Sequence, residues 1–118
     1  MLPAACARAA QIVRYALLML LGLAGETALA DEKADRMMRL GRHLAQECTS
    51  CHRLDGASSG AIPNILGMHK DDFIATMQFY KTGARTNQAM VSVVQSLSAE
   101  EIEALAIFYG AQKKPPRR

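Results

Sequence analysis

The residues most able to do chemistry in this chain are two cysteines and a histidine. Cys48, Cys51 and His52 form the pattern C-x-x-C-H. This is the attachment signature of c-type haem, in which each thiol forms a thioether with one haem vinyl group and the histidine becomes an axial ligand of the iron. The pattern therefore predicts one covalent haem c, held by Cys48 and Cys51, with His52 on the iron.

Three other kinds of site could use the same residues. A thioredoxin-like redox pair requires a strand before the first cysteine, and no strand pattern precedes Cys48. A structural zinc would need His43 or His69 as a fourth ligand, and the chain lacks the second cysteine pair that such sites show. A lone disulfide would leave His52 without a role. The motif favours haem over each alternative.

A basic and then apolar leader precedes the motif. Arg8 and Arg14 are followed by an apolar run over residues 15–25 and by an Ala-x-Ala sequence that ends at Ala30. This is the pattern of a secretory signal peptide, and the run is shorter than the about 20 apolar residues that span a membrane. We expect residues 1–30 to be cleaved after Ala30, which predicts a periplasmic protein without stable membrane insertion.

Charge and cysteine counts change when the leader is set aside. The whole chain has 118 residues, a net charge of +3 and three cysteines, one of which is Cys6 in the leader. Four of the twelve remaining basic residues lie in residues 113–118, which we expect to be a disordered tail. A nucleic-acid-binding domain needs a basic face on its folded body, so this function is excluded. Residues 31–112 form a small domain that a cofactor core would stabilise.

The elements that must position the motif are predicted to be helices. Apolar side chains at helical spacing predict one helix over residues 33–47, which leads directly into the motif, and a second over residues 70–81. Ser98 and Glu101 have the spacing of a capping box, which predicts a last helix that ends before Gly110. The remaining segments read as loops, so the domain is predicted to be all-α.

Over residues 35–110 the chain resembles the class I c-type cytochromes. The resemblance implies the cytochrome c fold, with three to five helices wrapped around one covalently bound haem. It rests on four segments in the family's order: residues 48–52, 62–67, 83–90 and 97–109.

The resemblance also implies two specific contacts. The first and last helices should cross with Gly41 facing the region of Leu105 and Phe108. The carbonyl of Pro63 should accept the Nδ1 proton of His52. Such a bond fixes the tautomer of a ligating histidine and raises its basicity.

The second axial position of the iron decides whether the protein carries electrons or binds ligands. We favour Met90, which lies in a predicted loop 38 residues after His52 and has enough chain to reach the opposite haem face. The family's distal methionine occupies the same loop. Met68 is the second choice, and a vacant position, as in a ligand-binding haem sensor, is the third. The complete set of candidates is Met37, Met38, Met68, Met77, Met90, His43 and His69.

These observations predict a one-electron carrier rather than an enzyme. The sequence shows no nucleophile, acid–base pair or phosphate loop that catalysis would use. We expect the haem to be surrounded by apolar side chains, which favour the ferrous state. The side chains expected there are Ile65, Leu66, Met77 and Phe79.

A narrower resemblance concerns the redox partner. The run over residues 80–85, followed by Met90, is similar to short periplasmic bacterial cytochromes, including the cytochrome subunit of flavocytochrome c sulfide dehydrogenase. It implies a sulfide-oxidising flavoprotein as electron donor. The alternative is a free shuttle between respiratory or photosynthetic complexes. A tight complex would use an apolar patch beside the haem edge, whereas a shuttle would use a ring of charge.

Overall fold

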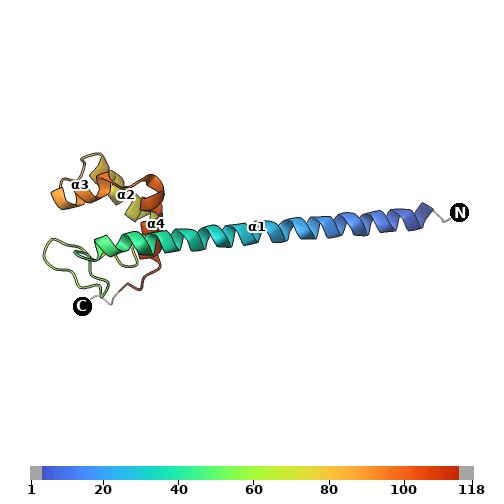
Figure 1. The fold of residues 1–118 in the computed structure, drawn as a ribbon, viewed down its shortest axis with the longest axis horizontal. Helices are drawn as coiled ribbons and strands as arrows, with labels where there is room; N and C mark the ends of the chain where they lie inside the picture. The colour runs from blue at the N-terminus through green and yellow to red at the C-terminus, as the bar shows by residue number, and fades with distance from the viewer. Residues whose placement is uncertain (1–3, 115–118) are drawn as a thin grey trace. The chain divides into compact units, whose positions relative to one another are not determined.

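The computed structural model describes residues 4–114, with the backbone alone for residues 4–10, 12–13 and 16–27. Four helices follow one another: α1 (Ala4–Cys48), α2 (Lys70–Lys81), α3 (Gln88–Gln95) and α4 (Ala99–Gly110) (Figure 1). The described residues form no strand. The prediction of an all-α fold is confirmed. Residues 115–118 of the predicted tail lie outside the described residues.

The chain consists of two units, residues 1–35 and residues 36–118. In the first unit, the described residues 4–35 are helical and belong to α1. No helix in the described part of the chain is long and apolar enough to cross a membrane. Cleavage after Ala30 stays a prediction.

The second and fourth helices match their predicted ranges. α2 covers the predicted residues 70–81. At the start of α4, the hydroxyl of Ser98 accepts the N–H of Glu101, and the Glu101 carboxylate accepts the N–H of Ser98. The predicted capping box is therefore confirmed. The hydrogen bond from the Ser98 backbone lowers the pKa of the Glu101 carboxyl.

The other two helices differ from prediction. The predicted helix start at residue 33 is wrong, because α1 begins at Ala4. The preceding residues are rich in alanine and leucine, which favour helix, and no proline interrupts them. The loop predicted around Met90 is wrong for residues 88–90, which form the first turn of α3. The side chain of Asn87 caps this helix by accepting the N–H of Met90 at 3.2 Å.

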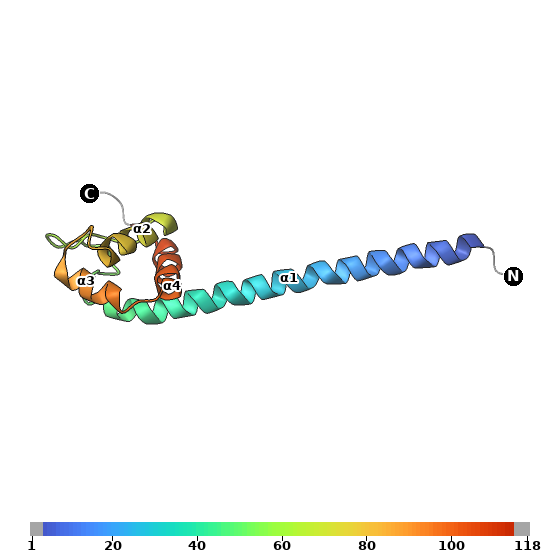
Figure 2. The ribbon, with the colours of Figure 1, turned by 90° about the horizontal axis from the view of Figure 1, so that it is seen from above.

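The last part of α1 crosses α4 at Gly41 (Figure 2). A β-carbon on Gly41 would overlap the backbone carbonyl of Ala104 and would lie 2.8 Å from the Cβ of Phe108. The two backbones approach this closely because glycine has no side chain. The crossing fixes the end of α1, and with it Cys48, against α4.

The core of the second unit is formed mainly by α2 and α4. Phe73 and Met77 of α2 are buried, as are Ile102, Leu105 and Tyr109 of α4. α2 packs against α3 as well as α4. It therefore links the helix crossing to the segment that carries Met90.

Candidate haem site

One cavity of about 470 Å³ collects most of the predicted site residues. Its volume falls in the range of about 300–1,000 Å³ that is typical of cofactor and ligand sites. It is bounded by the end of α1, the following loop, α2 and α3. The lining side chains that carry sulfur or an imidazole are Cys48, Cys51, His52, Met68, Met77 and Met90.

The turn after α1 brings the motif into the cavity. The backbone N–H groups of Cys51 and His52 donate to the carbonyl of Cys48 at 3.2 and 2.8 Å. Cys48 is half-buried, Cys51 is exposed and His52 is buried. Both thiols are free rather than joined in a disulfide. Burial raises the pKa of the Cys48 thiol. The turn thus presents two thiols and one imidazole to the same space.

The imidazole of His52 is held by the loop that follows it. Its Nδ1 lies 2.9 Å from the carbonyl oxygen of Pro63. Because a carbonyl oxygen only accepts, Nδ1 carries the proton and donates it. The lone pair of Nε2 is then free for a metal. This bond has the form that orients a histidine ligand.

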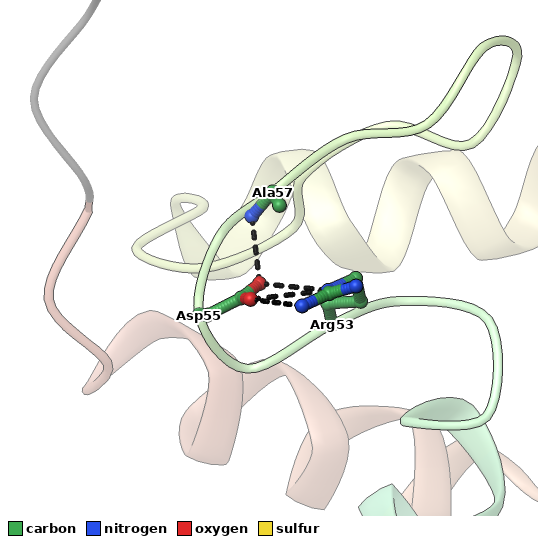
Figure 3. Close-up of polar contacts among 3 residues, drawn as sticks. All are labelled: Arg53, Asp55 and Ala57. Atoms are coloured by element: carbon green, nitrogen blue, oxygen red, sulfur yellow. Dashed lines mark hydrogen bonds and ion pairs between the residues drawn. The ribbon is translucent and has the colours of Figure 1, made fainter.

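The loop over residues 53–67 is held by hydrogen bonds near both of its ends. Near its start, Asp55 accepts hydrogen bonds from the guanidinium of Arg53 and from the N–H of Ala57 (Figure 3). The bond from Arg53 is the main cause that lowers the pKa of the Asp55 carboxyl. Near its end, the N–H of Gly67 donates to the carbonyl of Tyr109 at 2.9 Å. The loop that carries Pro63 is therefore ordered by polar contacts.

A second wall of the cavity includes Met90, which is half-buried in the first turn of α3. This wall is anchored to the end of α2. The N–H of Arg85 donates to the carbonyl of Phe79 at 2.9 Å, and the side chain of Gln95 donates to the carbonyl of Lys81 at 3.2 Å. Met90 thus depends on contacts that the rest of the fold provides.

The cavity reduces the candidates for the second axial ligand. Met68, Met77 and Met90 line it together with His52. The other candidates, Met37, Met38, His43 and His69, are not among its lining residues. Three methionine sulfurs therefore remain within the site.

The prediction that Leu66 and Phe79 lie beside the haem is wrong. Phe79 is 50% exposed and Leu66 is buried, and neither lines the cavity. Phe79 lies two positions after Met77, so it falls on a different face of α2. Ile65 and Met77 do line the cavity, as expected.

Sequence reasoning gave no site role to Arg85, Asn87 and Tyr80, which also line the cavity. The guanidinium of Arg85 lies 5.7 Å from the ring centroid of Tyr80. The Gly83-x-Arg85 pattern could have indicated a site role for Arg85. A guanidinium beside an apolar cavity can pair with an acidic group on the bound molecule.

The donor set fits a haem. A macrocycle needs apolar walls, two sulfurs at one edge and an imidazole beside them, and the cavity offers all three. A zinc site does not fit, because no three His, Cys, Asp or Glu side chains in the described residues could hold a metal ion.

Known proteins support the same assignment, although no family model matches the chain. The cytochrome subunit of sulfide dehydrogenase from Chlorobaculum tepidum is 32% identical over 63% of this chain and 67% of its own length. Cytochrome c-553 from Desulfomicrobium norvegicum is 33% identical over 56% of this chain and 86% of its own length. The thiosulfate dehydrogenase electron acceptor of Thiomonas intermedia is 30% identical, over 58% of this chain and 33% of its own length.

The chain spans less than half the length of two other cytochromes that it matches. The two relatives covered over two thirds or more of their length are both cytochromes. Electron transfer by a c-type haem is common to this group, as carriers or as electron-transfer subunits. The chain is therefore a member of the c-type cytochromes, a small bacterial electron-transfer protein whose cofactor is covalently bound haem c.

Proposed function

We propose that this protein is a periplasmic one-electron carrier with His/Met ligation of its haem iron. In this proposal Cys48 and Cys51 form the thioethers, and His52 and Met90 are the axial ligands. The observation that carries it is the single cavity whose lining includes all four residues, with Met90 on a different helix from the motif.

Each residue has a distinct physical task in this proposal. Cys48 and Cys51 retain the haem covalently, and the carbonyl of Pro63 orients His52 by accepting its Nδ1 proton. A thioether sulfur from Met90 favours ferrous over ferric iron and so raises the reduction potential. The haem supplies the reversible one-electron chemistry. The protein keeps the same ligands throughout, so little reorganisation accompanies the electron.

Substitution of the methionines tests the ligation. Met90→Ala should abolish the ferric methionine–iron absorption band. It should also lower the reduction potential, because the thioether that favours ferrous iron is lost. Met68→Ala is the competing variant, since Met68 also lines the cavity. Loss of the band in Met68→Ala, with retention in Met90→Ala, would transfer the assignment to Met68.

We also propose that the electron donor is a dehydrogenase such as a sulfide-oxidising flavoprotein. Two relatives are named as a sulfide dehydrogenase subunit and a thiosulfate dehydrogenase electron acceptor. Two of the segments that line the cavity carry little charge, as a tightly bound subunit requires. Between residues 54 and 69 the only charged side chain is Asp55, and between residues 82 and 99 it is Arg85.

Exposed apolar side chains add to this argument. Val93 lines the cavity and is 39% exposed, and Ala61 and Ala89 are exposed lining residues as well. A free shuttle, the alternative, would instead show charges that steer transient encounters. The low charge beside the cavity favours the subunit.

Isolation of the protein from its native periplasm tests the partner. A flavoprotein should co-purify, and the complex should persist at moderate salt because apolar contacts are not screened. Val93→Lys should release the flavoprotein, whereas Arg42→Ala, an exposed change on α1, should not. A cytochrome that purifies alone at low and moderate salt would instead be a free shuttle.

The periplasmic location rests on the leader, so we propose residues 1–30 as the signal peptide and residues 31–112 as the cytochrome domain. The mass of the mature holoprotein checks both this cleavage and the haem. It should equal that of a chain beginning at Asp31 plus one haem, and the haem should remain attached after denaturation. A mature chain that begins at Met1 would contradict the cleavage.

A further inference from the structure

One buried polar group has no role in the site described so far. Tyr109 is fully buried on α4. Among the described residues, its hydroxyl is the only buried side-chain nitrogen or oxygen without a hydrogen-bond partner. An unpaired buried hydroxyl lowers the stability of the fold, and a phenylalanine would fill the same space without that cost. The hydroxyl therefore requires a physical explanation.

Tyr109 is held in place from several sides. Its ring stacks on Phe73 with centroids 5.8 Å apart and meets Phe108 edge-on at 5.2 Å. Its carbonyl accepts the N–H of Gly67. Phe73 lines the cavity and Tyr109 does not, so the tyrosine lies behind the cavity wall. The ring therefore has no freedom to carry the hydroxyl to another partner.

The half-buried Cys48 packs against the buried cluster that contains Tyr109, and its thiol is the polar group beside this hydroxyl. Burial raises the pKa of Tyr109, and the neighbouring Cys48 raises it further. Burial raises the pKa of Cys48, and its contact with the Tyr109 hydroxyl acts in the opposite direction. The other polar neighbour of the sulfur is the carbonyl of Leu44, at the long distance of 3.9 Å. The hydroxyl and the sulfur are thus close without an ordinary hydrogen bond.

Attachment of the haem changes what this sulfur can do. A thiol can donate its hydrogen to the Leu44 carbonyl, but a thioether sulfur has no hydrogen and can only accept. The donor that remains beside the sulfur is the Tyr109 hydroxyl. We propose that Tyr109 donates a hydrogen bond to the thioether sulfur of Cys48 and thereby raises the reduction potential of the haem.

The direction of the effect follows from the position of the sulfur. A donor to the sulfur withdraws electron density from the substituted edge of the macrocycle, which stabilises the electron-rich ferrous state. Hydrogen bonds to groups bonded to a redox centre are an established means of tuning it. The inference rests on the proposed attachment at Cys48, and Tyr109 acts through that sulfur as a positioning residue.

Tyr109→Phe in the holoprotein tests the proposal. At a fixed solution potential, the ratio of ferrous to ferric haem should fall about threefold. This corresponds to a reduction potential lower by about 28 mV, at 59 mV per tenfold change for one electron. Resonance Raman spectra should show a shifted thioether C–S stretching band. In heavy water the same band should move in the wild type and stay fixed in Tyr109→Phe. Unchanged potential and unchanged band would overturn the proposal.

Two single-thioether backgrounds locate the effect. Tyr109→Phe should leave the potential unchanged in Cys48→Ala, where its sulfur is absent, and should lower it in Cys51→Ala, the matched control. An equal effect in both backgrounds would overturn the proposal. If Cys48→Ala does not yield a holoprotein, the C–S band in the two-cysteine proteins decides the question alone.

These results separate the inference from the function on which it rests. Wild-type protein that loses its haem on denaturation would contradict the attachment at Cys48 and the inference with it. Wild-type protein that keeps its haem, with a Tyr109→Phe variant of identical potential and C–S band, would overturn the inference alone.

Discussion

The two walls of the cavity are organised in different ways. On one side, a single turn carries Cys48, Cys51 and His52, and the partner of His52 is Pro63, eleven residues away. On the other side, Met90 is positioned by a short helix that packs against α2. The first wall is built by local sequence and the second by tertiary contacts. We therefore expect the Met90 wall to be the easier of the two to open by substitution.

The largest effect should come from breaking the frame behind the His52 wall. Gly41→Ala places a β-carbon against the backbone of Ala104, which cannot yield as a side-chain end would. Because the clash is with backbone, we take the upper end of the usual overpacking cost, about 3 kcal/mol, of which higher helix propensity returns about 1 kcal/mol. We expect a net loss of about 2 kcal/mol, seen as a melting temperature lower by roughly 10 °C for a domain of this size.

Gly60→Ala is the matched control for this change. Unlike Gly41, Gly60 has a positive φ, of 58°, and a β-carbon there meets nothing within 4 Å. The backbone strain alone should cost about 1 kcal/mol. Equal destabilisation by the two variants would show that the crossing with α4 is not the frame of the first wall.

The second effect separates the walls directly. Asn87→Ala removes the cap of α3, and Ser98→Ala removes the cap of α4. Each cap is worth about 1 kcal/mol. Only Asn87→Ala should loosen Met90, because the side chain of Asn87 accepts the backbone N–H of Met90. On heating, the methionine–iron band of Asn87→Ala should be lost below the temperature of global unfolding.

The Ser98→Ala variant should lose that band and its helical circular dichroism together. If the two caps behave alike, the Met90 wall has no separate stability. The comparison between the walls would then fail.

The same difference explains what could be predicted from sequence. The C-x-x-C-H motif and the Ser98–Glu101 capping box are local patterns, so the first wall and the start of α4 were predictable. α3 is only eight residues long, and its start depends on the single cap Asn87, so local patterns predict a loop there. Short helices are stabilised by packing rather than by propensity.

Contacts between side chains that are far apart in the sequence could not be predicted from local patterns either. Tyr109 is buried on α4, and Cys48 packs against the same cluster of buried side chains. The two residues lie far apart in the sequence, so their proximity follows from how α1 crosses α4. Phe79 was placed beside the haem because of its type, although its helical position turns it outward. Chain topology, rather than residue type, decides such contacts.

A smaller effect concerns Pro63. Its carbonyl, and not its ring, accepts the proton of His52, so Pro63→Ala keeps the bond. The unfolded chain becomes more flexible, which should cost about 0.4–1 kcal/mol of stability. The reduction potential should stay within error of the wild type. A clear fall in potential would mean that the ring itself fixes the carbonyl, and that the first wall is less locally determined than we infer.

The smallest effect tests the exposed turn that begins the same loop. The Arg53 guanidinium and the N–H of Ala57 lower the pKa of Asp55 below its ordinary value of 3.8. A carboxyl whose pKa is lower in the folded state contributes stability that is fully present above the ordinary value. That contribution is lost as the pH falls through the lower, folded-state pKa. Asp55→Asn should therefore be less stable than the wild type at about pH 6, and the difference should vanish in strong acid.

Because the pair is exposed and salt-screened, this difference should be small and should shrink at high ionic strength. Thermal melting of the two proteins at both pH values measures it, with the methionine–iron band as a second signal. The turn belongs to the His52 wall, so the band should follow global unfolding in both proteins. Early loss of the band in Asp55→Asn would couple this loop to Met90 and remove the distinction between the walls.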